Sequence, residues 1–403
     1  MIAASAVLVF AACQPGAQPG GGKGTITIYS ELPRQGSSKG QTDTIVNAIK
    51  LALEQRNNSV GGYSVNYVDG DDSTAEAGQW TEAQAIALAT QAANDNSVVG
   101  YIGTFNSGAA KVVIPILCRV GIAMISPANT YPGLTKPGKG EPDEPDKYYK
   151  DCKDGKKNYH RVVPADDLQG LAGAKWAKQL GLTKVFVVDD SQIYGKGIAD
   201  VFRKEGPGQG LEIVGNASIL GTETDYKALA EQIKQSGAQL MYFGGITQQN
   251  APQLWRDVKA ANPDIAMMGP DGIFEQAFID GAGEAAEGTY ITFGGVPPDQ
   301  LTGKGAEFVQ QYKQKYNQEL EAYTAYGYEA ANVLLDAIER AAAKNPSDTV
   351  QLRAFTLDEV KATKDYQGVL GTWSFDENGD TTLTTMSGNQ VTGGEFKFVT
   401  LIE

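Results

Sequence analysis

The stretch VVGYIGTFNSGAAKVVIPILCRVGIAMISPANT, residues 98–130, contains the pattern that decides the fold. Two short apolar runs, VVGYIG and IAMIS, flank a longer stretch whose apolar side chains recur at three- and four-residue spacing. The short runs predict strands, and the stretch between them predicts a helix. A strand, a helix and a second strand in this order indicate a βαβ unit with parallel strands.

The same alternation repeats along most of the chain. Further strands are expected at TITIYS, YSVNYVD, KVFVVDD, LEIVG, QLMYFG, IAMMG and TYITF. Amphipathic stretches between them, such as QTDTIVNAIKLALEQ, TEAQAIALATQAAND, DLQGLAGAKWAKQLG and DYKALAEQIKQSG, predict helices. The fold class is therefore α/β, with mainly parallel sheets flanked by helices.

The length of 403 residues is too great for one ordinary core and favours two similar lobes. The strand series restarts after a polar insertion at residues 135–159. Crossings between the lobes are expected at HRVVPADDLQG, TYITFGG and LGTWSFDENGD, and three crossing strands would form a hinge. These crossings assign residues 25–161 and 292–371 to lobe 1, and residues 162–291 and 372–403 to lobe 2.

The N-terminus has the features of an export signal. MIAASAVLVFAA is an apolar run that ends in two alanines before Cys13, which predicts a signal peptide with a lipobox at residues 1–13 and lipidation of Cys13. The alternative is a buried strand with an incidental cysteine. QPGAQPGGGKG, residues 14–24, has almost no apolar side chain and predicts a flexible tether.

Composition and charge argue against several classes of function. The net charge of −14 repels polyanions, so nucleic acid is not an expected partner. The single histidine, His160, cannot supply a two-histidine metal site, and neither a metal nor another cofactor is expected. Cys118 and Cys152 would meet an oxidising environment after export; whether they form a disulfide stays open.

The loops that follow the predicted strands carry the candidate binding residues, because ligands of open parallel sheets bind beyond the carboxyl ends of the strands. Ser107 follows VVGYIG and is expected to cap the next helix, whose free N–H groups could receive a carboxylate. The loop from Ala128 to Thr130 follows IAMIS and offers carbonyl acceptors and a hydroxyl donor. Tyr194 and Asp271 follow strands of the second lobe, where Asp271 could pair with an ammonium.

The chain resembles the leucine/isoleucine/valine-binding family of type I periplasmic binding proteins, the receptors of branched-chain amino-acid ABC transporters. The resemblance rests on IGTFNSGAA, ISPANTYPGLT, RVVPADDLQG, DDSQIYGKG, YFGGI, MGPDG and LGTWSFDENGD. It implies a two-lobed fold in which Ser107, Ala128 and Thr130 hold the ligand's α-carboxylate and ammonium. It further implies that Asp271 binds the ammonium and that Tyr194 closes over the ligand. The wall positions that it implies are Phe105, Asn106, Ile246 and Tyr323.

The sequence also departs from the family pattern. An aromatic residue often found over the ligand is missing around RQGSSKG, where Gly36 lies near its place. Ile246 stands where an aromatic residue can occur, and Asp271 is one methylene shorter than Glu. These differences imply a side-chain pocket that is larger or differently shaped, so the identity of the ligand stays open.

The expected function is that of an exported, lipid-anchored, monomeric receptor, which captures a branched-chain or related amino acid and delivers it to an ABC permease. The alternative is an extracellular sensor of amino acids or amides that is coupled to a signalling partner. An enzyme is not expected, because the sequence has no nucleophile elbow, metal-ligand cluster or phosphate loop.

Overall fold

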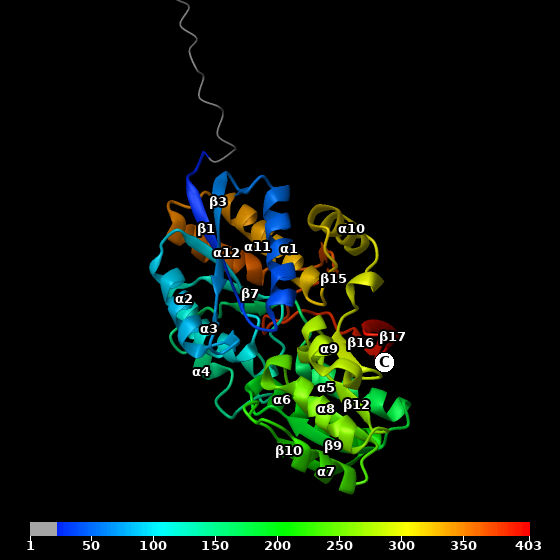
Figure 1. The fold of residues 1–403 in the computed structure, drawn as a ribbon. Coiled ribbons are helices and arrows are strands. Elements are labelled where there is room, and N and C mark those ends of the chain that lie inside the picture. The colour runs from blue at the N-terminus through cyan, green and yellow to red at the C-terminus, as the bar shows by residue number, and fades with distance from the viewer. Residues whose placement is uncertain (1–21) are drawn as a thin grey trace, which may run out of the picture.

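The computed structural model describes residues 22–403. The predicted signal peptide, the lipidation site at Cys13 and most of the predicted tether lie outside the described residues. The described chain forms two lobes stacked along the long axis of the molecule (Figure 1). Each lobe is built on its own mixed sheet, and the two-lobed α/β fold of mainly parallel strands agrees with the sequence prediction.

Lobe 1 is built on a six-stranded sheet with the order β2-β3-β1-β6-β7-β8. Its strands are β1 (Thr25–Leu32), β2 (Ser59–Val60), β3 (Tyr63–Asp71), β6 (Val98–Gly103), β7 (Ala123–Ser126) and β8 (Tyr159–Arg161). All pairings except that of β2 with β3 are parallel. A short hairpin, β4 (Ser73–Thr74) and β5 (Gln79–Trp80), follows β3.

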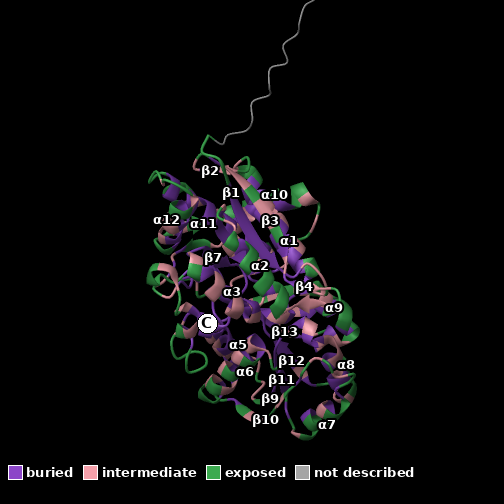
Figure 2. Ribbon diagram, turned by 90° about the vertical axis from the view of Figure 1, so that its left-hand side faces the viewer, coloured by how far each residue is buried: buried purple, intermediate pink, exposed green. Residues whose placement is uncertain are grey.

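Helices cover both faces of the first sheet because neighbouring strand residues point to opposite faces. One face packs against α1 (Lys39–Gln55), α11 (Thr324–Ala342) and α12 (Thr349–Lys361), and the other packs against α2 (Glu82–Asn94) and α3 (Ser107–Val120). Within β6, Val99 and Ile102 join the first core and Val98 and Tyr101 the second. β1 is buried almost along its whole length, whereas the outward faces of the helices are exposed (Figure 2).

Lobe 2 is built on a seven-stranded sheet with the order β10-β9-β11-β12-β13-β16-β17. Its strands are β9 (Lys184–Asp189), β10 (Glu212–Ser218), β11 (Leu240–Gly244), β12 (Ala266–Gly269), β13 (Tyr290–Gly294), β16 (Met386–Thr392) and β17 (Glu395–Leu401). The first five strands are parallel, and β16 and β17 add an antiparallel edge. One face packs on α5 (Asp166–Gln179) and α6 (Ile193–Glu205), and the other on α7 (Lys227–Gln235), α8 (Ala251–Ala261) and α9 (Gln276–Ala282).

Three segments connect the two lobes. The first leads from β8 to α5, the second from β13 to α10 (Lys304–Tyr316), and the third from β15 (Gly371–Trp373) to β16. β15 pairs with β14 (Tyr366–Gly368) in lobe 1. β13 pairs with β16 through Gly294, so residues 292–294 lie in the second sheet, and the crossing points shift by a few residues from those that the sequence predicts.

The polar insertion at residues 135–159 packs against α3 and is linked to the C-terminal part of that helix. It contains the single turn α4 (Asp146–Tyr149), and its Glu144 is buried, where the phenol of Tyr131 donates a hydrogen bond to Glu144 Oε2 over 2.7 Å. A disulfide joins Cys118 of α3 to Cys152, with a Cα–Cα distance of 4.6 Å. The insertion is therefore tied to the helix whose other end carries Ser107. Among residues 22–403, no helix combines the length and apolarity that a bilayer span requires.

Candidate ligand-binding site

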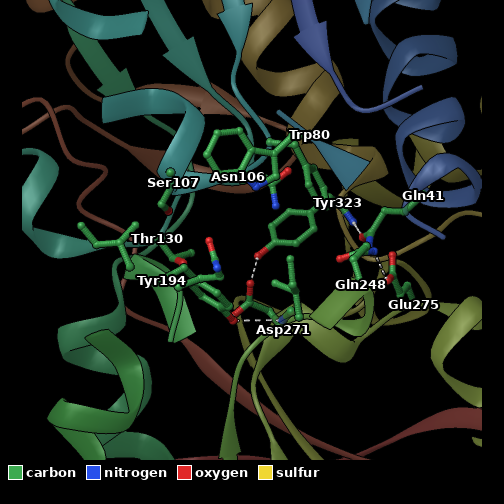
Figure 3. Close-up of a pocket in the computed structure, with 17 residues that line it drawn as sticks. Gln41, Trp80, Asn106, Ser107, Thr130, Tyr194, Gln248, Asp271, Glu275 and Tyr323 are labelled. Atoms are coloured by element: carbon green, nitrogen blue, oxygen red, sulfur yellow. Dashed lines mark hydrogen bonds between the residues drawn. The ribbon is translucent and has the colours of Figure 1, made fainter. Parts of the chain in front are cut away.

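A cavity lies between the two lobes, beyond the carboxyl ends of their strands. Both lobes contribute side chains to it (Figure 3). The lining residues are Gln41, Trp80, Phe105, Asn106, Ser107, Gly108, Ala128, Thr130, Gln192, Ile193, Tyr194, Ile246, Gln248, Asp271, Gly272, Glu275 and Tyr323.

The wall of lobe 1 consists of two loops that hydrogen bonds hold together. The hydroxyl of Ser126 donates to the carbonyl of Thr104 over 2.8 Å, and the amide Nδ2 of Asn129 donates to the carbonyl of Phe105 over 2.9 Å. The Tyr131 N–H donates to Ser107 Oγ over 3.3 Å. Because Ser107 Oγ accepts this bond, its own proton is available to a ligand. The loops after β6 and β7 thus act as one preorganised surface.

Helix α3 begins at Ser107, one residue earlier than the sequence predicts. Asn106 occupies the N-cap position, with extended backbone and no side-chain cap bond, so the expected capping role of Ser107 is wrong. The first helical N–H groups have no partner inside the helix. These groups and the positive end of the helix dipole face the cavity beside the Ser107 hydroxyl, and the arrangement suits a carboxylate.

The wall of lobe 2 is held by a buried aspartate behind the cavity. Asp190 Oδ1 accepts from the Gln192 N–H over 3.0 Å, and Oδ2 accepts from the Ile246 N–H over 3.1 Å. One carboxylate thereby joins the loop after β9 to the loop after β11. Burial raises the pKa of Asp190 to about 7, against the effect of these two hydrogen bonds.

Asp271 is the acidic centre of lobe 2 and lies in a 3-10 turn after β12. Its Oδ1 accepts from the Tyr194 phenol over 2.8 Å, and its Oδ2 accepts from the Tyr323 phenol over 2.5 Å. Burial raises the pKa of Asp271, and the two phenols only partly offset this effect. The buried Asp166 lies close enough that the charge of Asp271, after burial itself, helps to raise the pKa of Asp166 well above its ordinary value. A cation beside Asp271 would relieve this unfavourable environment.

Two further hydrogen bonds cross the cleft. The amide Nε2 of Gln248 in lobe 2 donates to Ser38 Oγ in lobe 1 over 2.5 Å. The amide Nε2 of Gln249 donates to Gln79 Oε1 over 2.9 Å. With the bond from Tyr323 of lobe 1 to Asp271 of lobe 2, these contacts hold the lobes closed over the cavity.

All nine residues proposed from the sequence line the cavity: Ser107, Ala128, Thr130, Tyr194, Asp271, Phe105, Asn106, Ile246 and Tyr323. Gly36 does not line it; a side chain there would collide with the backbone of Gly78. The sequence did not single out the other eight lining residues, which are Gln41, Trp80, Gly108, Gln192, Ile193, Gln248, Gly272 and Glu275. Gln248 and Glu275 lie in the same post-strand loops as Ile246 and Asp271, which is a signal that could have found them.

Comparison with known proteins identifies relatives that all belong to one family. A model of the periplasmic binding protein family matches residues 25–395. Leu/Ile/Val-binding protein homolog 2 of Brucella abortus is 28% identical over 362 residues, covering 89% of this chain and 88% of that protein. Leu/Ile/Val-binding protein homolog 1 of Brucella melitensis is 30% identical, covering 74% and 73% of the two chains.

The fold also matches solved structures. The crystal structure of the leucine-binding protein LivK from Thermotoga maritima superposes with a TM-score of 0.80, at 26% identity over 94% of this chain and 99% of that one. The two-lobed fold, the cavity between the lobes and the extent of the family match lead to one conclusion. This chain belongs to the periplasmic binding protein family and is a homologue of its Leu/Ile/Val-binding members.

Proposed function

We propose that this protein captures a free α-amino acid in the cleft between its lobes and delivers it to an ABC permease. The observation that carries the proposal is that one wall of the cavity suits a negatively charged group and the opposite wall suits a positively charged group. The N-terminus of α3 and Ser107 of lobe 1 suit a carboxylate, and Asp271 of lobe 2 suits an ammonium. A zwitterion satisfies both sides at once. The structural neighbour LivK from Thermotoga maritima is a leucine-binding protein, which supports an amino-acid ligand.

Closure follows from the distribution of these groups over the two lobes. Lobe 1 holds the ligand through its paired loops, including Ala128 and Thr130. Lobe 2 then completes the binding site with Tyr194 and Asp271. Ligand binding favours the closed state, because the ligand can contact both lobes only when they are closed. The proposed role of the site is to bind and release the ligand without breaking a bond in it.

We further propose that the receptor acts outside the cytoplasm and is anchored by a lipid on Cys13, as the run before that residue indicates. The tether at residues 14–24 would let the lobes reach the permease. Cys13→Ser should release the protein from the membrane fraction. Retention of this variant on the membrane would contradict the anchor without affecting the ligand proposal.

A thermal-shift panel tests the ligand class. The protein is unfolded, dialysed free of small molecules, refolded and heated with each of the common amino acids. A ligand at a hundredfold excess over its Kd should stabilise the fold by about 2.7 kcal/mol. A matched set of decarboxylated amines and α-hydroxy acids should give smaller shifts. A panel without any shift would overturn the proposal.

A further inference from the structure

The far end of the cavity is polar, which a receptor for purely aliphatic side chains would not need. Glu275 lies at this end together with Gln248 from lobe 2 and Gln41 from α1 of lobe 1 (Figure 3). The Gln248 amide donates to Glu275 Oε1 over 2.8 Å. Gln41 accepts from the Tyr323 N–H through its Oε1, at 3.3 Å. These three residues are distinct from Ser107 and Asp271, which are proposed to bind the carboxylate and the ammonium of the ligand.

Glu275 is buried with half of its carboxylate unsatisfied. The residue is only 3% exposed, and within residues 22–403 Oε2 makes no hydrogen bond of normal geometry. Buried polar atoms in native proteins almost always have a partner, so an orphan oxygen that lines a cavity points to a donor supplied from outside the chain. Burial raises the pKa of Glu275, and hydrogen bonding to the neighbouring side chains of Thr247, Gln248 and Gln41 only partly offsets this effect.

The charges around the cavity support the same conclusion. Its described lining includes two carboxylates, Asp271 and Glu275, and no Lys or Arg. A zwitterionic ligand with an apolar side chain would pair its ammonium with Asp271 and leave Glu275 uncompensated. The charge of Glu275 also raises the pKa of the neighbouring Glu321, although burial contributes more. A nitrogen donor at the far end of the ligand would satisfy Oε2 and oppose this concentration of negative charge.

We infer that Glu275, with Gln41 and Gln248, selects amino acids whose side chain ends in a nitrogen donor, either a cationic group or a carboxamide. The inference rests on the proposed amino-acid receptor and defines its substrate class. In the bound state the terminal N–H donates to Glu275 Oε2. The Gln248 amide already donates to Glu275 and Ser38, and Gln41 Oε1 already accepts from the Tyr323 N–H. Gln248 Oε1 can therefore accept from the end of the ligand and the Gln41 amide can donate to it, which suits ammonium, guanidinium and carboxamide ends.

Calorimetry on ligand-stripped protein tests the inference with a panel of lysine, arginine, glutamine, norleucine and leucine. Norleucine serves as the apolar analogue of lysine. At least one nitrogen-bearing amino acid should bind at least about tenfold more tightly than norleucine, as expected for a charge-assisted hydrogen bond in a buried site. If leucine or norleucine binds as tightly as every nitrogen-bearing member, the inference is wrong while the receptor proposal stands. Absence of binding by any amino acid overturns both.

Two variants assign the preference to Glu275. Glu275→Leu should abolish the tenfold preference by weakening the nitrogen-bearing ligand and retaining norleucine, and Glu275→Gln should reduce the preference for a cation more than that for a carboxamide. The exposed Glu284→Gln is the matched control and should leave every affinity unchanged. Retained norleucine binding shows that each variant is folded. An undiminished preference in Glu275→Leu would contradict the role of this carboxylate.

Discussion

Tyr323 of lobe 1 donates a hydrogen bond to Asp271 Oδ2 of lobe 2 over 2.5 Å, and this bond joins the two walls of the cavity. Tyr323 lies directly before α11, and Asp271 follows β12, so neither residue can keep this contact when the lobes separate. The bond therefore couples closure to the group that is proposed to hold the ligand's ammonium.

Tyr323→Phe should weaken closure without damaging the fold. A hydrogen bond to a charged group contributes about 1.5–3 kcal/mol, so the ligand's dissociation rate should rise about tenfold or more. Stopped-flow dissociation measures this rate. Tyr316→Phe is the control, because the Tyr316 phenol donates to the Asn47 carbonyl within lobe 1. Equal dissociation rates for wild type and Tyr323→Phe would contradict the role of the crossing bond.

Asp271→Ala should cost a zwitterionic ligand about 3–5 kcal/mol, because the ligand's ammonium would be buried without its counter-charge. Calorimetry measures the change, and the exposed Asp264→Asn of the same lobe provides the control. Binding that survived Asp271→Ala nearly intact would mean that the ligand has no ammonium at this position.

Ser107→Ala and Thr130→Val should weaken an amino acid through its carboxylate. Each variant removes one hydroxyl donor from the lobe 1 wall and should cost about 1–3 kcal/mol. The same variants should leave the affinity for the decarboxylated amine of that amino acid almost unchanged, because the amine has no carboxylate to accept these bonds. Equal losses for the amino acid and the amine would show that the hydroxyls do not contact the carboxylate.

Removal of the disulfide should destabilise lobe 1 and leave the ligand-binding residues in place. Cys118 and Cys152 are 34 positions apart, and a loop of this size implies about 3–4 kcal/mol in the chain-entropy model. Urea unfolding of the Cys118→Ala/Cys152→Ala variant measures the loss against untreated wild type. If the variant unfolds at the wild-type urea concentration, the disulfide does not stabilise the native fold.

The contribution of Asp72 to the stability of the fold should fall as pH rises between about 4 and 8. This carboxyl is fully buried, and burial, reinforced by the charge of Asp71, raises its pKa from 3.8 to about 8. The folded state then retains a proton that the unfolded state releases, so the stabilising contribution is complete below pH 3.8 and is lost as pH rises to about 8. The buried Glu31 nearby, whose pKa is also raised, should act in the same direction.

Asp72→Asn should therefore flatten this dependence. The variant should be more stable than wild type at pH 8 by at least about 1.4 kcal/mol, the equivalent of one pKa unit, with a smaller difference at pH 5. Thermal unfolding at the two pH values measures the effect, and the exposed Asp154→Asn is the control. Parallel pH profiles for wild type and Asp72→Asn would contradict the prediction.

Much of the fold was predictable from the sequence because local patterns determine it. The buried parallel strands appear as short apolar runs, and the helices between them show clear periodicity. Residues directly after strands, such as Thr130 and Asp271, were also accessible, since parallel strands bring their carboxyl ends to one edge. The start of a helix can differ by a residue from the predicted one, as in α3, which begins at Ser107 although Ser107 was expected to be its N-cap.

Two further cavity residues depend on contacts that no local pattern encodes. Trp80 reaches the cavity from the β4–β5 hairpin, and Gln41 reaches it from the first turn of α1. Their positions are set by tertiary packing, which the one-dimensional pattern does not determine. Glu275, by contrast, follows β12 in the same loop as Asp271, so its place was accessible from the sequence.

The measurement that tests the central claim most directly is calorimetry of ligand-stripped wild-type protein with the best-bound amino acid and with its α-hydroxy acid analogue. The two ligands share the carboxylate and side chain and differ only in the ammonium that Asp271 is proposed to hold. The account predicts tight binding of the amino acid and a loss of at least about 3 kcal/mol for the hydroxy acid. Equal affinities for the two, or no heat with any amino acid, would contradict it.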